Sequence, residues 1–128
     1  VTLIGTSSMR QVCEKAALLL EQDGISAEVI DPRTLVPLDE NTILDSVKRT
    51  SRAIVVDEGH QNFGTTAEIA ARISEKAFYF LDAPVIRMGA MDVPIPFSPV
   101  LEDITVPTAT GVAEKAKKIV AGELIHAL

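Results

Sequence analysis

Two stretches of this sequence decide its fold, Asp31-Pro-Arg-Thr-Leu-Val-Pro-Leu-Asp39 and Val55-Val-Asp-Glu-Gly-His-Gln-Asn-Phe-Gly-Thr-Thr-Ala-Glu-Ile69. In each stretch, an apolar run is followed by a loop and then by residues that start a helix. Two strand–loop–helix units of the same polarity imply parallel strands joined by right-handed crossovers. The sequence therefore predicts an α/β fold, a three-layer α/β/α sandwich with a mainly parallel sheet of four to five strands.

The other elements follow from the same alternation of apolar runs and helix-start signals. Strands are expected at Val1–Gly5, Ala27–Asp31, Ala53–Asp57 and Pro84–Met88. Helices are expected from Met9, after Asp39, from about Thr65 and from about Thr110 to Gly122. If the strand order is two-one-three-four, the loops after the first and third strands flank the crevice where such sheets bind ligands.

Three helix starts carry side chains that suit the free amides of a first helical turn. Ser8 with Gln11, and Thr65 with Glu68, have the spacing of a capping box. Asp39 is a preferred N-cap residue. All three signals support the predicted helix positions.

Composition and charge exclude several classes of protein. A net charge of −6 disfavours nucleic-acid and anionic-membrane surfaces, because both require clustered lysine and arginine. No apolar run approaches the roughly 20 residues of a membrane span. The single cysteine, Cys13, excludes an intrachain disulfide and is expected to be a small core residue. A reducing, cytoplasmic-type compartment is the expectation.

The start of the chain bears on its domain organisation. A length of 128 residues fits one domain. The chain begins with Val1, which passes directly into an apolar strand, whereas natural termini are usually loosely held. We therefore expect residues 1–128 to be a single domain and Val1 to be a cut or boundary within a longer protein.

The loop Gly5-Thr-Ser-Ser8 is a candidate anion site. Backbone amides at a helix N-terminus, together with the hydroxyls of Thr6, Ser7 and Ser8, can hold a phosphate. The loop lacks the glycine-rich dinucleotide fingerprint and the phosphate-binding P-loop motif. Plain helix capping explains the same residues, so both interpretations stay open.

His60 is the second candidate, because it follows the third strand at the same predicted edge. A histidine there can act as an acid or base near neutral pH. No cysteine or serine nucleophile and no metal-ligand spacing surrounds it, and a hydrogen-bonding loop histidine is the alternative. His126, near the chain end, is a weaker candidate. We assign no catalytic residue and no metal ligand.

The segment from Asp92 to Pro107 is rich in proline and too long for a simple connector. It combines apolar and acidic side chains, which suits a protein interface. The interface candidates are Asp92, Ile95, Phe97, Glu102 and Asp103. The alternative is that the segment packs over its own core.

Several stretches together resemble one known family. They are Gly24–Asp39, Val55–Ile69, Ala83–Arg87, Asp92–Pro96 and Leu101–Glu102. In this order they are similar to the C-terminal domain of transketolase-like thiamine diphosphate enzymes. Within that group they resemble the β subunit of the decarboxylating component of 2-oxo acid (pyruvate, branched-chain) or acetoin dehydrogenases, which are oxidoreductases in multienzyme complexes.

The resemblance implies an accessory and assembly domain. It implies an extra antiparallel edge strand from residues before Val1, and a missing upstream pyrimidine-binding domain. It implies thiamine diphosphate and magnesium in the complete enzyme, bound by other domains, so this domain alone is expected to be non-catalytic. The implied partners are an α subunit, a second β subunit and the basic subunit-binding domain of the dihydrolipoyl acyltransferase. The implied location is the cytoplasm, or the mitochondrial matrix in a eukaryote.

Two other functions stay open from the sequence. In one, the domain is the C-terminal domain of another transketolase-like enzyme, of the transketolase or deoxyxylulose-phosphate synthase type. Alternatively, it is a stand-alone anion- or nucleotide-binding module that uses Thr6–Ser8 and His60. The proline-rich segment from Asp92 to Pro99 favours the dehydrogenase.

Overall fold

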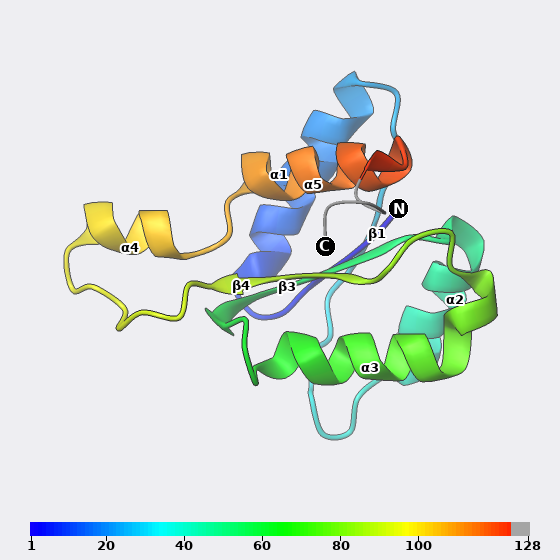
Figure 1. Cartoon of the computed structure of the whole chain (residues 1–128), viewed down its shortest axis with the longest axis horizontal. Helices are drawn as coiled ribbons and strands as arrows, with labels where there is room; N and C mark the ends of the chain where they lie inside the picture. The colour runs from blue at the N-terminus through cyan, green and yellow to red at the C-terminus, as the bar shows by residue number, and fades with distance from the viewer. Residues whose placement is uncertain (124–128) are drawn as a thin grey trace.

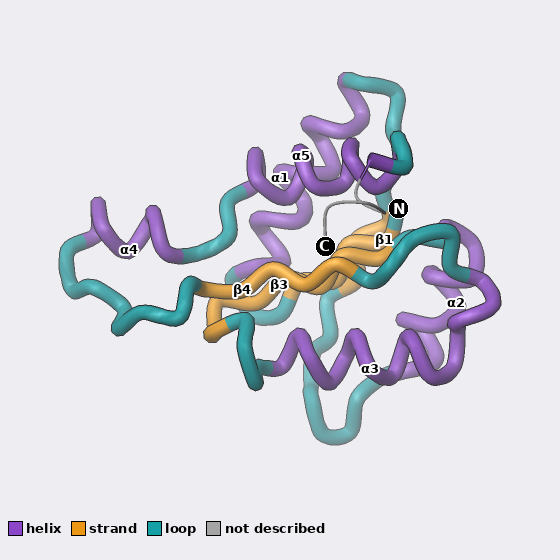
Figure 2. Tube along the Cα trace, in the orientation of Figure 1, coloured by secondary structure: helices purple, strands orange, loops and turns teal. Residues whose placement is uncertain are grey.

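Four apolar runs form one sheet in the computed structural model, which describes residues 1–123. The strands are β1 (Thr2–Gly5), β2 (Glu28–Ile30), β3 (Ala53–His60) and β4 (Ile86–Ala90). Their order is β2-β1-β3-β4, and all three pairings are parallel. Figure 2 shows the strands in orange, between two layers of helices. The predicted parallel sheet is therefore confirmed, and its strand order is the one for which the loops after β1 and β3 flank a crevice.

Four helices cover the two faces of the sheet. They are α1 (Met9–Gln22), α2 (Glu40–Thr50), α3 (Thr65–Ala77) and α5 (Ala109–Val120). α1 and α5 lie on one face, and α2 and α3 lie on the other (Figure 1). A short 3-10 turn, η1 (Phe78–Phe80), follows α3, and a further helix, α4 (Pro99–Thr105), lies away from both layers. The α/β/α sandwich is confirmed.

Side chains alternate between the two cores along each strand, as the pleat of a strand requires. Leu3 and Val56 contact the core under α1 and α5, while Ile4 and Val55 contact the core under α2 and α3. All four side chains are fully buried. Cys13 also lies in the first core, where burial raises the pKa of its thiol to about 12. It is a core residue, as the sequence predicts.

The helix caps agree with the sequence at one position and differ at two. Asp39 caps α2, because its carboxylate accepts hydrogen bonds from the amide and the hydroxyl of Thr42. The predicted capping boxes of Ser8 and Thr65 are wrong. The Ser8 hydroxyl donates to Glu58, and the Thr65 hydroxyl serves Asp57. Carboxylates from the end of β3 are the stronger acceptors, and they draw both hydroxyls away from the helices.

Two leucines of α1 test this packing. Leu20 is fully buried, so Leu20→Ala should leave a cavity and lower the free energy of unfolding by about 2–5 kcal/mol. Leu18 lies on the outer face of the same helix and is 61% exposed, so Leu18→Ala should change it by less than about 0.5 kcal/mol. Urea denaturation at neutral pH measures both changes. Equal losses in the two variants would contradict the helix orientation.

Candidate functional site

A crevice opens where the strand order reverses, beyond the carboxyl ends of β1 and β3. Its volume is about 590 Å³. The loop after β1, the segment that follows β2, the end of β3 and the start of α3 form its walls. Doubly wound sheets bind ligands at this position. The sequence places its first candidate residues at this edge.

Asp57 forms part of the crevice wall as a half-buried carboxylate. The hydroxyl of Thr6 donates a hydrogen bond to its Oδ1 at 2.8 Å. Burial alone would raise the pKa of Asp57, but hydrogen bonds from Thr65, Thr6 and two backbone amides outweigh this effect. The pKa of Asp57 is therefore lowered from its ordinary value. The crevice holds a fixed negative charge at neutral pH.

The serines of the same loop point to different partners. Ser8 donates its hydroxyl to Glu58, while Ser7 lies exposed in a left-handed backbone conformation with φ of 50°. Two of the three candidate hydroxyls, those of Thr6 and Ser8, thus donate hydrogen bonds to carboxylates of the protein. An anion that approached the start of α1 would meet these negative charges. An anion site at Thr6–Ser8 stays a prediction.

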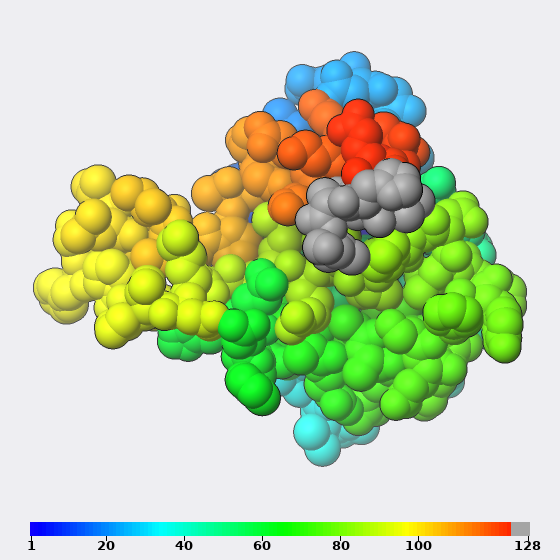
Figure 3. Space-filling view, in the orientation of Figure 1, coloured from blue at the N-terminus to red at the C-terminus, as the bar shows by residue number. Residues whose placement is uncertain are grey.

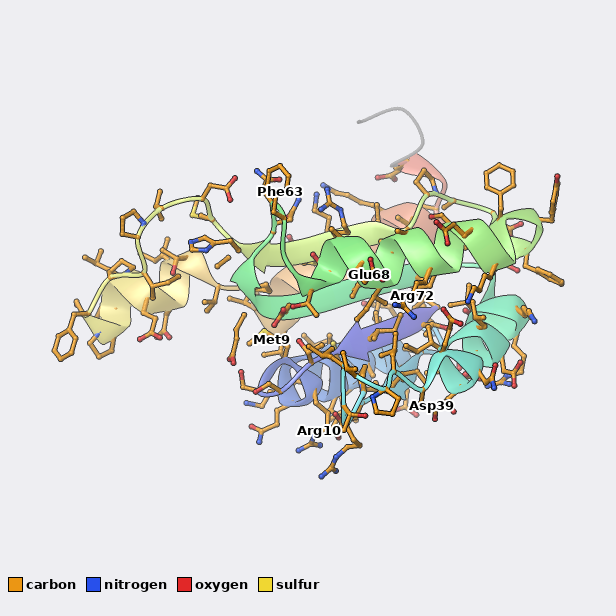
Figure 4. The ribbon with its side chains drawn as sticks, turned by 90° about the horizontal axis from the view of Figure 1, so that it is seen from below. Met9, Arg10, Asp39, Phe63, Glu68 and Arg72 are labelled. Carbon is orange, nitrogen blue, oxygen red and sulfur yellow. The ribbon has the colours of Figure 1, made fainter. Side chains whose placement is uncertain are left out.

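Two arginines, Arg10 and Arg33, also line the crevice. Asp31 lies between Arg10 and Arg33, with its Oδ2 at 3.7 Å from Nε of Arg10 and at 3.6 Å from Nη1 of Arg33. Figure 4 shows Arg10, which lies in the first turn of α1. In the sequence, Asp31 and Arg33 belong to a motif that indicates the fold, and neither was predicted as a site residue. The signal for them was their place directly after β2, at the carboxyl end of a parallel strand.

His60 lies apart from the crevice. Its Nε2 donates a hydrogen bond to the carbonyl of Val93 at 3.1 Å, and it lines a separate hollow with Phe63 and Asp92. The structure therefore does not bring His60 together with Thr6–Ser8 in one cavity. His126 lies outside the described residues. Within residues 1–123, no three His, Cys, Asp or Glu side chains are grouped so that they could hold a metal ion.

The aromatic side chains all lie at the surface, because none of them is buried. The chain has four phenylalanines, one tyrosine and no tryptophan. All are exposed: Phe63, Phe78, Tyr79, Phe80 and Phe97. Aromatic rings carry the largest apolar areas and usually dominate cores and interfaces. Here the core contains no aromatic ring, and all five rings are exposed to solvent.

Residues 92–107, which we call the arm, project from the sandwich. Figure 3 shows the arm in yellow as a lobe beside the main body. Phe97 is 103% exposed and Ile95 is 44% exposed, and the acidic candidates Asp92, Glu102 and Asp103 are exposed as well. These side chains do not pack on the core of the chain. Their role in an interface stays a prediction.

The base of the arm is tied to the loop that holds Phe63. The side-chain amide of Asn62 donates to Asp92, and the amide of Met91 donates to the carbonyl of Thr105 at 3.0 Å. Phe63 has a φ of 57°, a left-handed conformation that costs a bulky residue about 1 kcal/mol. Its ring points away from the sheet (Figure 4). The fold thus holds an exposed ring in a strained position beside the arm.

Most of the chain matches the model of a known protein family. The model of the transketolase C-terminal domain matches residues 1–112. The chain belongs to this family. The resemblance found in the sequence is thereby confirmed. None of the helices within residues 1–123 is long and apolar enough to cross a membrane.

Individual known proteins are also similar to most of the chain. The chain is 44% identical over 108 residues to the β subunit of acetoin:2,6-dichlorophenolindophenol oxidoreductase from Bacillus subtilis (strain 168), covering 84% of this chain and 32% of that protein. It is 40% identical over 119 residues to the mitochondrial pyruvate dehydrogenase E1 component subunit beta of Dictyostelium discoideum, covering 93% and 33%. The chain spans about a third of these relatives.

A solved structure shares the fold as well. It is a split gene transketolase described as an inactive beta4 tetramer, with a TM-score of 0.77 and 27% sequence identity. The match covers 91% of this chain and 37% of that one. This transketolase C-terminal domain therefore shares its fold with a chain that forms a tetramer.

The carboxylate of Asp57 gives a pH-dependent contribution to stability. Because its pKa is lowered on folding, it stabilises the folded state above its ordinary pKa of 3.8, and this stabilisation is lost as the pH falls through the folded value. The difference in unfolding free energy between wild type and Asp57→Asn should therefore shrink from pH 7 to below pH 3.8. Urea denaturation across this range measures it.

Two further variants control this experiment. Thr65→Val removes a hydrogen bond to Asp57 and should reproduce part of the change in pH dependence. Ser7→Ala alters an exposed hydroxyl of the same crevice and should follow the wild type. A constant difference between wild type and Asp57→Asn at every pH would refute the role of the carboxylate charge.

Proposed function

We propose that this chain is an accessory and assembly domain of the β subunit of a thiamine diphosphate-dependent 2-oxo acid or acetoin dehydrogenase. One observation carries the proposal: the arm and the adjoining Phe63 expose apolar side chains that the domain does not cover itself. Monomeric proteins rarely expose large contiguous apolar surface unless it meets a partner. The function of the domain is then binding, and the oxidoreductase activity belongs to the complete enzyme.

The relatives support placement in a longer subunit. The proteins that it matches at 40–44% identity are β subunits of an acetoin:2,6-dichlorophenolindophenol oxidoreductase and of pyruvate dehydrogenase E1 components, and the chain spans about a third of each. Residues 1–128 are then the C-terminal domain of such a subunit, without its upstream pyrimidine-binding domain. The complete enzyme acts in the cytoplasm of a bacterium or in the mitochondrial matrix of a eukaryote. Mitochondrial relatives are consistent with the second location.

Three partners follow from this placement. An α subunit and a second β subunit complete the decarboxylating component, and a tetramer formed by a split gene transketolase supports association between β chains. The third partner is the basic subunit-binding domain of the dihydrolipoyl acyltransferase. The net charge of −6, together with Asp92, Glu102 and Asp103 on the arm, would steer a basic partner toward this domain. Nucleic acids and membranes are not among the proposed partners.

Thiamine diphosphate and magnesium belong to the other domains of the complete enzyme in this proposal. The described residues do not fit the pair. They contain no cluster of three metal-binding side chains, and the hydroxyls of Thr6 and Ser8 are engaged by carboxylates that would repel a diphosphate. No catalytic step is therefore assigned to this domain.

A transketolase-type enzyme is the second candidate function. The solved split gene transketolase shares the fold and favours it, whereas the relatives of higher identity favour the dehydrogenase. The upstream sequence separates the two: a pyrophosphate-binding domain in the same chain indicates transketolase or deoxyxylulose-phosphate synthase. A stand-alone anion- or nucleotide-binding module is a third function, which requires the cation-lined crevice to bind its ligand alone.

A titration with thiamine diphosphate and magnesium tests the division of labour. The titration is measured by NMR on the full chain. We expect no saturable shifts of the backbone amide signals at millimolar ligand. Saturable shifts at Thr6–Ser8 that disappear in a Ser7→Ala, Ser8→Ala variant would favour the anion-binding function. Shifts at Asp57–Gln61 would likewise make the crevice a site of its own.

The arm provides a test of assembly. Phe97 is fully exposed, so Phe97→Ser should leave the unfolding midpoint of the chain unchanged. If the arm lies in an interface, the same change should weaken binding to the α subunit about 30-fold, as the loss of an aromatic anchor does. Leu18→Ser, an exposed site on α1, is the matched control. Isothermal titration with purified α subunit measures both, and equal affinities would count against the arm as the contact.

A further inference from the structure

β4 closes one side of the sheet and pairs only with β3 among the described residues. In Figures 1 and 2, β4 lies in front of β3, at the edge that faces the viewer. An edge strand presents a row of N–H and C=O groups that point away from the sheet. These groups are available for hydrogen bonds to another extended segment.

A groove of about 500 Å³ follows this edge. Five consecutive residues of the strand region, Val85–Gly89, line it. Because successive side chains of a strand point to opposite faces, five consecutive residues can share one hollow only if it runs along the backbone edge. Residues 104–107, which return from α4, form the opposite wall. The groove is therefore bounded by a strand edge and by the base of the arm.

The end of β3 restricts how β4 can be approached. The pairing of β3 with β4 shifts register between Val56 and His60. A Cβ placed on Gly89 would lie 2.7 Å from the backbone nitrogen and Cα of Gln61. Arg87 also donates a hydrogen bond to the carbonyl of Gln61 at 3.1 Å. One face of β4 is thus occupied by the chain itself, and among residues 1–123 the edge pairs with no other strand.

The charge of the groove differs from that of the whole chain. Its ionisable lining residues are Arg87 and Lys115, and both are cationic on a chain of net charge −6. A second copy of β4 would bring another Arg87 and Lys115 against them, so self-pairing is opposed by like charges. Met91 and Ile104 add apolar walls. The complementary occupant is an extended segment with acidic and apolar side chains.

We propose that the free edge of β4 binds an extended acidic segment of a partner polypeptide, which adds to the sheet as a fifth strand. Main-chain hydrogen bonds to β4 supply the affinity, and Arg87 and Lys115 favour acidic side chains on the bound segment. This site is separate from the exposed tip of the arm and does not depend on the assembly role.

NMR on the full chain tests the proposal. The probe is an acetylated hexapeptide of alternating valine and glutamate, with a dissociation constant of about 1 mM or lower expected. Saturable amide shifts should be confined to residues 85–91 and 104–107, and hydrogen exchange of the outward amides of β4 should slow. The matched peptides replace glutamate by lysine, or carry N-methyl groups on alternate amides; both should bind at least about tenfold more weakly.

Two charge variants place the site. Lys115→Glu, an exposed change on α5, should weaken binding of the glutamate peptide about threefold. Lys118→Glu changes an exposed lysine of the same helix outside the groove and should leave binding unchanged. Arg87→Gln should weaken binding as well, and its fold is checked by the spectrum of the free variant.

Several results would overturn the proposal. One is the absence of shifts at saturating peptide, and another is equal binding of the lysine or N-methylated peptide. Self-association of the chain through residues 85–89 would make a second copy the occupant. Binding that appears only in a chain shortened to end at Glu123 would make residues 124–128 the occupant.

Discussion

The two-sided burial of β3 is the constraint on which the rest of this structure depends. Its first four residues, Ala53–Val56, have no exposed area, and the strand pairs with β1 on one side and β4 on the other. Each large aliphatic side chain so buried contributes about 1.5–3 kcal/mol relative to an exposed one. Because β3 contacts both cores, its position fixes the helices of both layers. It also fixes the positions of Asp57 and His60, in the last half of the same strand.

The sequence predicts this framework well because its signals are local. Unbroken β-branched runs mark strands covered on both faces, and Asp39 marks a helix start through a contact three residues away. Where a distant group competes, local signals fail. The hydroxyls of Ser8 and Thr65 have the right spacing for caps, but carboxylates at the end of β3 take them instead. No pattern within either helix contains that information.

The candidate surfaces were predictable in part. Topology places the crevice, whereas Arg10 and Arg33 meet at Asp31 only because separate segments converge there. Pro99 begins α4, a favoured position for proline, in a segment where the sequence predicted no helix. The exposure of every aromatic ring, Phe63 included, had no sequence signal. Exposure depends on what the small aliphatic core leaves uncovered, and that is known only after the chain has folded.

The position of β1 between β2 and β3 has a consequence for the order of folding. Thr2 pairs with Glu28 on one side and with Ala53 on the other. The first strand therefore forms its backbone hydrogen bonds on either side only with residues far along the chain. Contacts between distant residues slow folding, because the chain loses the entropy of loop closure before the strand pairing stabilises it. During synthesis, the first strand therefore emerges from the ribosome long before its partner β3. Until then α1, the neighbour that is complete first, can cover only the Leu3 side of the strand, because Ile4 belongs to the core under α2 and α3.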